Sequence, residues 1–317
     1  MTTDSLKMGF RSLAAAGLIT LAACAGVATT VPRDPGEHGH PIRMEARRVP
    51  LGIGGADLAP GVTWAGGLSL HGVNLHGLSD LKLDGDQAWS VSDFGSLVRF
   101  TIRLDRAGRL VGAGGATTRR LTGPDGTPLQ PKAAADAEGI VLLPSGVAIS
   151  FERDHRIWSY GPRGTSLPVP LRRPDAAFGD NEGMEGLAAA PGGWLAMGEG
   201  GGAWTCEPTA CTALPHAPTA FIDGYKVTGA DVDPNGGWFV IERLYTPPLD
   251  MRARVRRMAP DGTLGPVLIA LRPPASVDNM EGIAAVRTAR GTRLYLLSDD
   301  NANPLEKTLL LAFDIAD

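Results

Sequence analysis

Short apolar runs recur along the chain, separated by turns that contain glycine or proline. Five times, an apolar segment begins beside an acid, turns at such a tip and returns as a second apolar segment that ends in another acid. The five hairpins are Asp80 to Asp93, Glu138 to Glu152, Glu185 to Glu199, Asp231 to Glu242 and Glu281 to Asp299. Small residues beside the first acid of the last four copies, at positions 139, 186, 230 and 282, are 47, 44 and 52 positions apart. This is the spacing of propeller blades, so the pattern predicts an all-β β-propeller with five or six four-stranded blades.

The two ends of the chain are expected to close this propeller. The last apolar segment, Thr308 to Ile315, needs neighbours because an exposed strand edge promotes aggregation. Strands near the amino terminus, around 47–51 and 62–70, can supply them. The pattern therefore predicts a blade that joins amino- and carboxy-terminal strands, while segment 115–135 leaves the choice between five and six blades open.

The composition agrees with many short strands and tight turns. The 317 residues include 42 glycines and 25 prolines, with 20% charged and 6% aromatic residues. The formal net charge is −4, and the basic residues are scattered or occur in short pairs such as Arg47-Arg48. These features argue against nucleic-acid binding as the main role. We expect a monomer whose partner is a small molecule.

The amino terminus predicts export. Lys7 and Arg11 precede the apolar run 12–23, which is short for a bilayer span but suits a signal-peptide core. The run ends in Leu-Ala-Ala-Cys24, which resembles a bacterial lipobox. We therefore expect a lipoprotein signal peptide at 1–23 and a lipid on Cys24 that anchors the protein to the outer membrane, on its periplasmic side. The alternative is a plain secretory signal cut near Ala25 or Ala28, which would give a secreted periplasmic protein.

The next segment separates this anchor from the domain. Residues 24–45 are rich in threonine, proline, glycine and charge, so we expect a flexible tether there and the propeller domain at 46–317. The two remaining cysteines, Cys206 and Cys211, flank the turn-forming sequence Glu-Pro-Thr-Ala. A hairpin disulfide between them fits an oxidising periplasm, and two free thiols are the alternative.

The hairpins should gather the acids at one place. The start of the first strand and the end of the second lie at the same edge of a hairpin, so each pair of acids is expected beside the central channel. Two carboxylates about 5 Å apart repel by several kcal/mol at an effective dielectric near 20, and hard oxygen ligands favour Ca²⁺ as the counter-ion. The structural alternative is that each acid accepts backbone N–H groups in its own turn. The predicted metal ligands are Asp136, Glu138, Glu152, Glu185, Glu199, Asp231, Glu242, Glu281 and Asp299.

Basic residues beside these acids suggest catalysis. Arg153 and Arg243 directly follow second-strand acids, and they could hold a phosphate group or steady the charge that develops on an ester. Glu138 or Glu185 could serve as the base while the cation polarises the ester oxygen. The sequence contains no GxSxG, HExxH, P-loop or dinucleotide-binding motif.

Several runs of the sequence together resemble a known family. They are, in order, WAGGLSLHGVNLHGLSDLKL, SVSDFGSLVRF, KAAADAEG, SFERDHRIWSY, NEGMEGLA, DNMEGIAAV and YLLSDDN. They are similar to the phytase-like family, also labelled "esterase-like activity of phytase", over residues 60–317. The resemblance implies an exported β-propeller related in fold to calcium-dependent phytases, which use bridging Ca²⁺ and basic residues on phosphomonoesters. It also implies a site formed, with Arg153 beside it, by Asp136, Glu138, Glu152, Glu185, Glu199, Glu242, Glu281 and Asp299.

These observations predict an enzyme that uses Ca²⁺ to hydrolyse phosphate esters or other small esters. Fewer lysines accompany the acids than a phytase would need for phytate, so phytate itself is not the expected substrate. The alternative is a non-catalytic, Ca²⁺-stabilised binding or assembly module of the cell envelope. A third possibility, a lactonase-like propeller with one central metal, predicts a single tightly bound ion.

Overall fold

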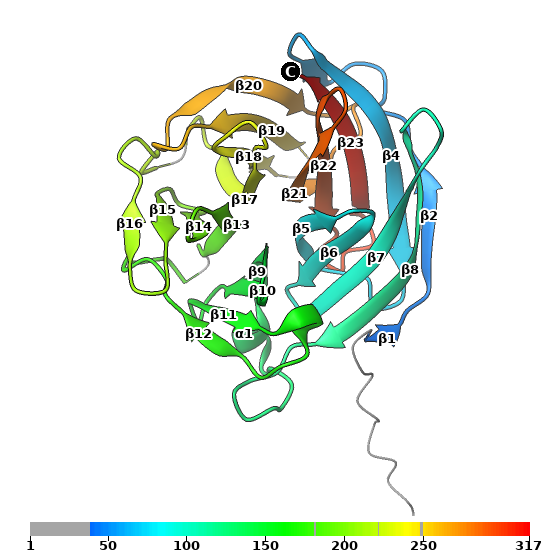
Figure 1. Ribbon diagram of the computed structural model, residues 1–317. Coiled ribbons are helices and arrows are strands. Elements are labelled where there is room, and N and C mark those ends of the chain that lie inside the picture. The colour runs from blue at the N-terminus through cyan, green and yellow to red at the C-terminus, as the bar shows by residue number, and fades with distance from the viewer. Residues whose placement is uncertain (1–38, 181, 221, 248–249) are drawn as a thin grey trace, which may run out of the picture. The chain divides into compact units, whose positions relative to one another are not determined.

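The computed structural model describes residues 39–317 except 181, 221 and 248–249. Within this part of the chain, the strands form five antiparallel sheets around a common centre (Figure 1). The predicted β-propeller is confirmed, and it has five blades. Segment 115–135 starts no further blade, because it holds the end of β8 (Leu110–Arg120), a loop and the short helix α1 (Lys132–Ala135). The predicted signal peptide, Cys24 and the tether up to residue 38 lie outside the described residues.

Blades are numbered by the order of their innermost strands along the chain, and their strands are given from the centre outward. Blade 1 contains β5 (Leu78–Asp84), β6 (Gln87–Ser92), β7 (Ser96–Leu104), β8 and β1 (His40–Pro41). Blade 2 contains β9 (Ala137–Leu143), β10 (Gly146–Phe151), β11 (Arg156–Tyr160) and β12 (Val169–Leu171), with a 3-10 turn, η2 (Pro162–Gly164), before β12. Blade 3 contains β13 (Met184–Ala190), β14 (Gly193–Gly198), β15 (Ala203–Cys206) and β16 (Cys211–Ala213).

The last two blades incorporate strands from the amino-terminal part of the chain. Blade 4 contains β17 (Lys226–Val232), β18 (Trp238–Thr246), β19 (Asp250–Met258), β20 (Leu264–Leu271) and β3 (Ala56–Leu58). Blade 5 contains β21 (Asn279–Thr288), β22 (Gly291–Asp299), β23 (Thr308–Ala316), β4 (Val62–Gly72) and β2 (Met44–Arg48). In blade 5, β23 pairs with β22 on one side and with β4 on the other. The predicted closure by amino- and carboxy-terminal strands is therefore confirmed.

The amino-terminal segment adds the outermost strand to three blades. β1, β2 and β3 pair with β8, β4 and β20, respectively. The prediction that the flexible tether reaches residue 45 is thus wrong for residues 40–45, which already contain β1 and the start of β2. Their polar composition concealed this, because strands that cover a sheet edge are short and face solvent. No helix among the described residues has the length and hydropathy needed to cross a membrane.

Apolar clusters fill each space between neighbouring blades. Between blades 5 and 1, Leu310 packs with Leu81 and Phe100, and between blades 4 and 5, Ile241 packs with Ile283. Similar clusters lie between the other neighbouring blades. Because the inner strands are covered on both faces, their sequences are almost continuously apolar, and every residue of β10 is buried. This packing fixes the inner strands, and therefore the residues at their ends, around the centre.

Blade 3 ends in a cross-linked hairpin. Cys206 and Cys211 are opposite each other in β15 and β16, and a disulfide joins them with their Cα atoms 4.0 Å apart. Cys206 is buried, and the hairpin forms the outer edge of the blade. The bond therefore joins the two outermost strands of blade 3, and β14 separates it from the innermost strand β13.

The innermost strand of every blade carries a β-bulge near its first residue. At each bulge one residue has no partner in the second strand, and these residues are Ser79, Glu138, Glu185, Thr228 and Glu281. A bulge re-aims its extra residue and bends the strand. The five bulges therefore place one polar side chain from each blade at the same end of the central channel.

Glycine follows the bulge in blades 2 to 5, where inner strands of neighbouring blades come close together. A Cβ atom on Gly229 would lie 2.4 Å from the carbonyl oxygen of Glu281 in the next blade. A Cβ atom on Gly282 would lie 2.9 Å from the carbonyl carbon of Asp80 in blade 1. Only a residue without a side chain allows the bulged residues to approach each other this closely.

We expect Gly229→Ala to lower the free energy of unfolding by about 1–3 kcal/mol, because the added methyl group overpacks the contact between blades 4 and 5. Gly114→Ala in β8 is the matched control, since a Cβ atom there has no heavy atom within 4 Å. Urea unfolding of both variants measures the difference. Equal stability of the two variants would show that the inner strands move apart without cost.

Candidate functional site

The second strand of each blade ends beside the bulged residue of the first. One residue beyond the last paired residue of the second strand, a further hydrogen bond joins the two strands. The backbone N–H of Glu152 donates to Asp136 O (2.8 Å), and that of Glu199 donates to Gly183 O (3.0 Å). The equivalent residue is acidic in four blades and basic in blade 4, and the series is Asp93, Glu152, Glu199, Arg243 and Asp299. The blade geometry thus builds two layers of polar residues around one opening.

These layers enclose a central cavity of about 200 Å³. Its lining residues are all polar or charged: Asp93, Lys132, Asp136, Glu138, Glu152, Arg153, Glu185, Glu199, Arg243, Glu281, Asp299 and Asn301. Eight of the twelve are acids and three are cations. The cavity therefore holds more negative than positive groups when all of them are ionised.

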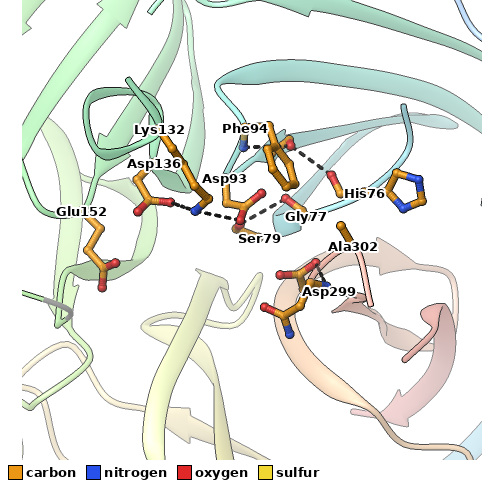
Figure 2. Close-up of polar contacts among 12 residues, drawn as sticks. His76, Gly77, Ser79, Asp93, Phe94, Lys132, Asp136, Glu152, Asp299 and Ala302 are labelled. Carbon is orange, nitrogen blue, oxygen red and sulfur yellow. Dashed lines mark hydrogen bonds and ion pairs between the residues drawn. The ribbon is translucent and has the colours of Figure 1, made fainter. Parts of the chain in front are cut away.

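One side of the central cavity is neutralised by residues of blades 1 and 2. Lys132 Nζ lies 3.0 Å from Asp93 Oδ2 and 2.8 Å from Asp136 Oδ1, so it bridges the two carboxylates (Figure 2). Arg153 Nε lies 2.6 Å from the other oxygen of Asp136 and 4.0 Å from Glu152 Oε2. Asp136 is therefore an ion-paired acid that fixes two cations at the cavity wall.

The other side is neutralised by two cations of blade 4, one of which, Arg243, stands where the other blades have an acid. Arg243 Nη1 lies 2.7 Å from Glu281 Oε1 and also contacts Asn279, while Nη2 lies 3.5 Å from Glu199 Oε1. Lys226 Nζ lies 3.0 Å from Glu199 Oε2. Blade 4 thus supplies positive charge to acids of blades 3 and 5.

Three glutamates lie between these two sides, and only one of them, Glu152, has a cationic partner, Arg153 at 4.0 Å. We call Glu138, Glu152 and Glu185 the central glutamates. Among the described residues, Glu138 and Glu185 have no hydrogen bond or ion pair to their carboxylates, although Glu185 is only 6% exposed. Ligand oxygens lie within 4.8 Å of one another in two groups that share Glu152: Asp136, Glu138 and Glu152, and Glu152, Glu185 and Glu199. Buried carboxylates without partners are unfavourable, so this arrangement requires protons or a cation.

The pKa values reflect this crowding. Burial, followed by the charges of Glu185 and Glu281, holds the pKa of Glu138 well above its usual range. Burial and the neighbouring charges of Glu199 and Glu281 do the same to the pKa of Glu185. The pKa of Glu152 is raised to about 7 by burial and by the charge of Asp136. In the absence of a cation, the central glutamates therefore keep protons that free glutamates lose.

The backbone beside the central cavity is also held in unusual conformations. Arg153, Asn301 and Ala302 have φ angles of 60°, 48° and 51°, in the left-handed region that residues other than glycine rarely adopt. Arg153 and Asn301 line the cavity. Such strain persists only where the surroundings enforce it, and it is concentrated at functional sites.

The donor set fits a hard divalent cation. All candidate ligands are carboxylate oxygens, and the unpartnered, buried Glu185 adds a donor that the fold itself leaves unused. Ca²⁺ accepts six to eight oxygen ligands in flexible geometry, whereas Zn²⁺ sites are built mainly from nitrogen and sulfur. The central glutamates, Asp136 and Glu199 could therefore hold Ca²⁺. Glu281 and Asp299 also line the cavity, as the sequence predicted.

Two predicted ligands lie elsewhere in blade 4. Val227 pairs with Glu242 and Asp231 pairs with Phe239, so the prediction that Asp231 and Glu242 lie side by side in the ring is wrong. Their separation of 11 positions differs from the 14 between Glu138 and Glu152, and this mismatch was the signal in the sequence. The structurally equivalent residues are Thr228 at the bulge and Arg243.

Both displaced acids have local partners. Glu242 is buried and lies 2.7 Å from Arg254 and 3.1 Å from Arg256, measured from its Oε2 to each Nε. Asp231 lies deeper along β17 and accepts a hydrogen bond from the backbone N–H of Ala285 in blade 5 (2.8 Å). Both acids therefore have structural partners, although these are arginines and a backbone N–H of another blade and not backbone N–H groups of their own turns.

Sequence reasoning missed several residues of the central cavity. Lys132 belongs to the short helix α1 and Asn301 to the turn after β22, both outside the repeated hairpins, and no repeat-based signal indicates them. Asp93 was visible as the acid that ends the first hairpin, and it lines the cavity. The segment that joins blades 1 and 2 therefore supplies a positive charge, Lys132, to the cavity that contains the central glutamates.

Comparison with known proteins gives one match in sequence and several in fold. The family described as "Phytase-like: Esterase-like activity of phytase" matches residues 73–302, a range that includes all residues lining the central cavity. No curated protein matches. Among solved structures, the allergen Mala s 1 of Malassezia sympodialis is 11% identical, with a TM-score of 0.42. The match covers 79% of this chain and 87% of the allergen chain. The glutaminyl cyclase of Myxococcus xanthus is 14% identical, with a TM-score of 0.44, and the match covers 86% of this chain and 100% of the cyclase chain.

Proposed function

Because this chain belongs to the phytase-like family, we propose that it is a Ca²⁺-dependent hydrolase of phosphate esters or other small esters, acting at the central cavity. One observation carries the proposal. Glu185 is buried at the centre without a hydrogen bond or ion pair from any described residue. Its neighbours Glu152 and Glu199 have carboxylate oxygens close enough to share a cation with it. Neither the blade interfaces nor the fold's hydrogen bonds use this carboxylate.

The cations of the cavity wall suit an anionic substrate. Arg153 and Arg243 lie on opposite sides of the central glutamates, paired with Asp136 and Glu281. Guanidinium groups bind phosphate and carboxylate oxygens through parallel N–H donors, and the acids that hold these arginines restrict their orientation. Both side chains can therefore orient the substrate and stabilise the negative charge that develops on its oxygens.

Proton transfer is assigned to the central glutamates. When bound, Ca²⁺ would supply polarisation of an ester oxygen and of the attacking water. Glu138 or Glu185 accepts the proton of that water, because each carboxylate faces the cavity and has no other described partner. Burial raises the pKa of both glutamates, so either carboxylate, once ionised, is a stronger base than a free glutamate.

A second function is favoured by the origin of the ligands. Glu152 comes from blade 2, and Glu185 and Glu199 come from blade 3, so a cation held by all three would cross-link two neighbouring blades. In this alternative the protein is a Ca²⁺-stabilised binding or assembly module without turnover. The two functions differ in catalysis, while both require the metal.

We also propose export, with a lipid anchor at Cys24 on the periplasmic side of the outer membrane. The charged, apolar and Leu-Ala-Ala-Cys segments in residues 1–24 support this location. The disulfide between Cys206 and Cys211 agrees with it, because such bonds are rare in reducing compartments. A secreted periplasmic form is the alternative.

We expect the purified protein to contain Ca²⁺ by elemental analysis and to hydrolyse 4-nitrophenyl phosphate or 4-nitrophenyl acetate. Activity should be lost with EDTA and restored by Ca²⁺, with Zn²⁺ as the control ion. Tight Ca²⁺ binding that raises thermal stability without any hydrolysis would favour the binding module. Absence of bound metal together with metal-independent hydrolysis would contradict the proposal.

A further inference from the structure

A tight turn at the end of β6 places an aromatic ring beside the central cavity. The turn is closed by a hydrogen bond from Gly95 N to Ser92 O (2.7 Å), and the Ser92 hydroxyl accepts the backbone N–H of Phe94 (3.2 Å). Asp93, the next residue in the same turn, lines the cavity and donates its backbone N–H to Gly77 O (2.9 Å). The turn thus holds an acid inside the cavity and a phenylalanine next to it.

The Phe94 ring rests on two residues of the cavity region. It lies over Lys132, with the ammonium 5.6 Å from the ring centroid, and beside Gly77 (Figure 2). A Cβ atom on Gly77 would lie 1.9 Å from Asp93 Oδ1 and 2.9 Å from Phe94 Cε2, so Gly77 packs closely against both side chains of the turn. The ring therefore contacts Lys132 and Gly77 while 41% of the residue stays exposed to solvent.

Folding does not account for this exposed ring. The aromatic side chains of the blade interfaces, such as Phe100 and Phe151, are fully buried. Every residue that lines the central cavity is polar or charged, so Phe94 adds an apolar surface directly beside Lys132 at an otherwise hydrophilic site. A ring next to a cation-bearing wall can contact the apolar part of a molecule whose anionic group enters the cavity.

We propose that Phe94 and Lys132 form a specificity subsite that binds the apolar or aromatic group of an anionic ester. This inference rests on the proposed function for the anionic head group, and it names the substrate class: monoesters with an aryl or arylalkyl group, in preference to esters of small or strongly hydrophilic alcohols. The Phe94 ring stacks against the organic group, and Lys132 lies between that group and the acids of the cavity. Phe94 is a specificity residue and takes no part in the chemical step.

Binding of two unreactive phosphonates tests the subsite without depending on turnover. We expect phenylphosphonate to bind the Ca²⁺-loaded protein about three- to tenfold more tightly than methylphosphonate, as measured by calorimetry, because aromatic contacts contribute this much beyond burial. Phe94→Ala should abolish the preference, and Phe94→Tyr should retain it. Val169→Ala, at an exposed apolar position on the outer strand β12, is the matched control and should leave the preference unchanged.

Each outcome of this experiment decides one question. If Phe94→Ala weakens both phosphonates equally, the ring only shields the Lys132 ion pairs and the subsite is refuted. Equal affinity of the wild-type protein for both compounds, or binding of neither, also overturns the proposal. A preference that depends on Phe94 in a protein without turnover would uphold the subsite and reject the hydrolase, so the two failures remain distinguishable.

Discussion

Replacing Glu185 with glutamine is expected to weaken Ca²⁺ binding by about 100-fold or more. Loss of residues that merely orient metal ligands already lowers metal affinity about 10- to 100-fold, and Glu185 is the buried donor that no described residue occupies. Glutamine has nearly the same shape, so the blades should keep their packing. Isothermal titration with Ca²⁺ measures the affinity, and the hydrolase panel measures the accompanying loss of turnover.

The same variant should make the metal-free protein more stable at pH 7, by roughly 1–3 kcal/mol. Burial and repulsion from Glu199 raise the pKa of Glu185, so folding at pH 7 must either take up a proton or bury a charge. Glutamine removes that requirement. Loss of metal affinity together with a gain in metal-free stability identifies a ligand, whereas a structural acid would lose stability when neutralised.

Asp231→Asn provides the matched control. Asp231 is an acid of an inner strand that accepts the N–H of Ala285, and it lies outside the central cavity. The Ca²⁺ affinity of the Asp231→Asn variant should equal that of the wild-type protein. If Asp231→Asn weakened Ca²⁺ binding as much as Glu185→Gln, or if Glu185→Gln retained full metal content, the site assignment would be wrong.

Most of the fold could be predicted because the hairpins repeat. In blades 2, 3 and 5, an acid followed by glycine opens the inner strand and a second acid ends the next strand, so these positions align at sight. The alternation of apolar runs and turns depends only on local sequence and on burial of both strand faces. Glu138, Glu185 and Glu281 could be located for this reason.

Blade 4 shows where this reasoning fails. Its bulged residue is Thr228 and its second-strand residue is Arg243, so neither equivalent position carries an acid. The sequence pattern indicated Asp231 and Glu242 only because they are the acids nearest to these two positions in the sequence. Side chains alternate between faces along a strand, so Glu242, next to Arg243, lies on the other face and pairs with Arg254. Register at a bulge depends on contacts between blades, which a single sequence does not display.

Residues from connecting segments could not be predicted either. Lys132 reaches Asp93 only because α1 packs beside the turn of blade 1, and the Cβ position of Gly95 would lie 2.8 Å from the Cβ of Ala135. Nothing in the sequence distinguishes Phe94 from other aromatic residues in turns, and its contact with Gly77 is visible only in the structure. Such contacts join elements far apart in the chain, and they determine how much of the negative charge the protein itself neutralises.

Without metal, the protein is expected to lose stability as the pH rises from about 5 to 8. The pKa of Glu152 and of Glu281 is raised to about 7, mainly by burial and by neighbouring carboxylates such as Asp136 and Asp93, respectively. The folded state therefore binds more protons than the unfolded state in this range, and stability must fall as those protons are lost. Each pKa unit corresponds to about 1.4 kcal/mol, so the combined effect should be on the order of a few kcal/mol.

With saturating Ca²⁺, the trend should weaken or reverse, because metal binding requires deprotonated carboxylates and becomes stronger as the pH rises. The expected observation is a difference in unfolding temperature between Ca²⁺- and EDTA-treated protein that grows steadily from pH 5 to pH 8. Subtracting the two conditions cancels the contribution of Asp80, which lies outside the central cavity. Burial raises the pKa of Asp80 to about 7, although its partner Lys82 acts in the opposite direction. Glu45 and Asp250 have lowered pKa values caused by arginine partners, and they affect stability only at lower pH. A difference that stays constant across this range would mean that Ca²⁺ binds somewhere other than among the central glutamates.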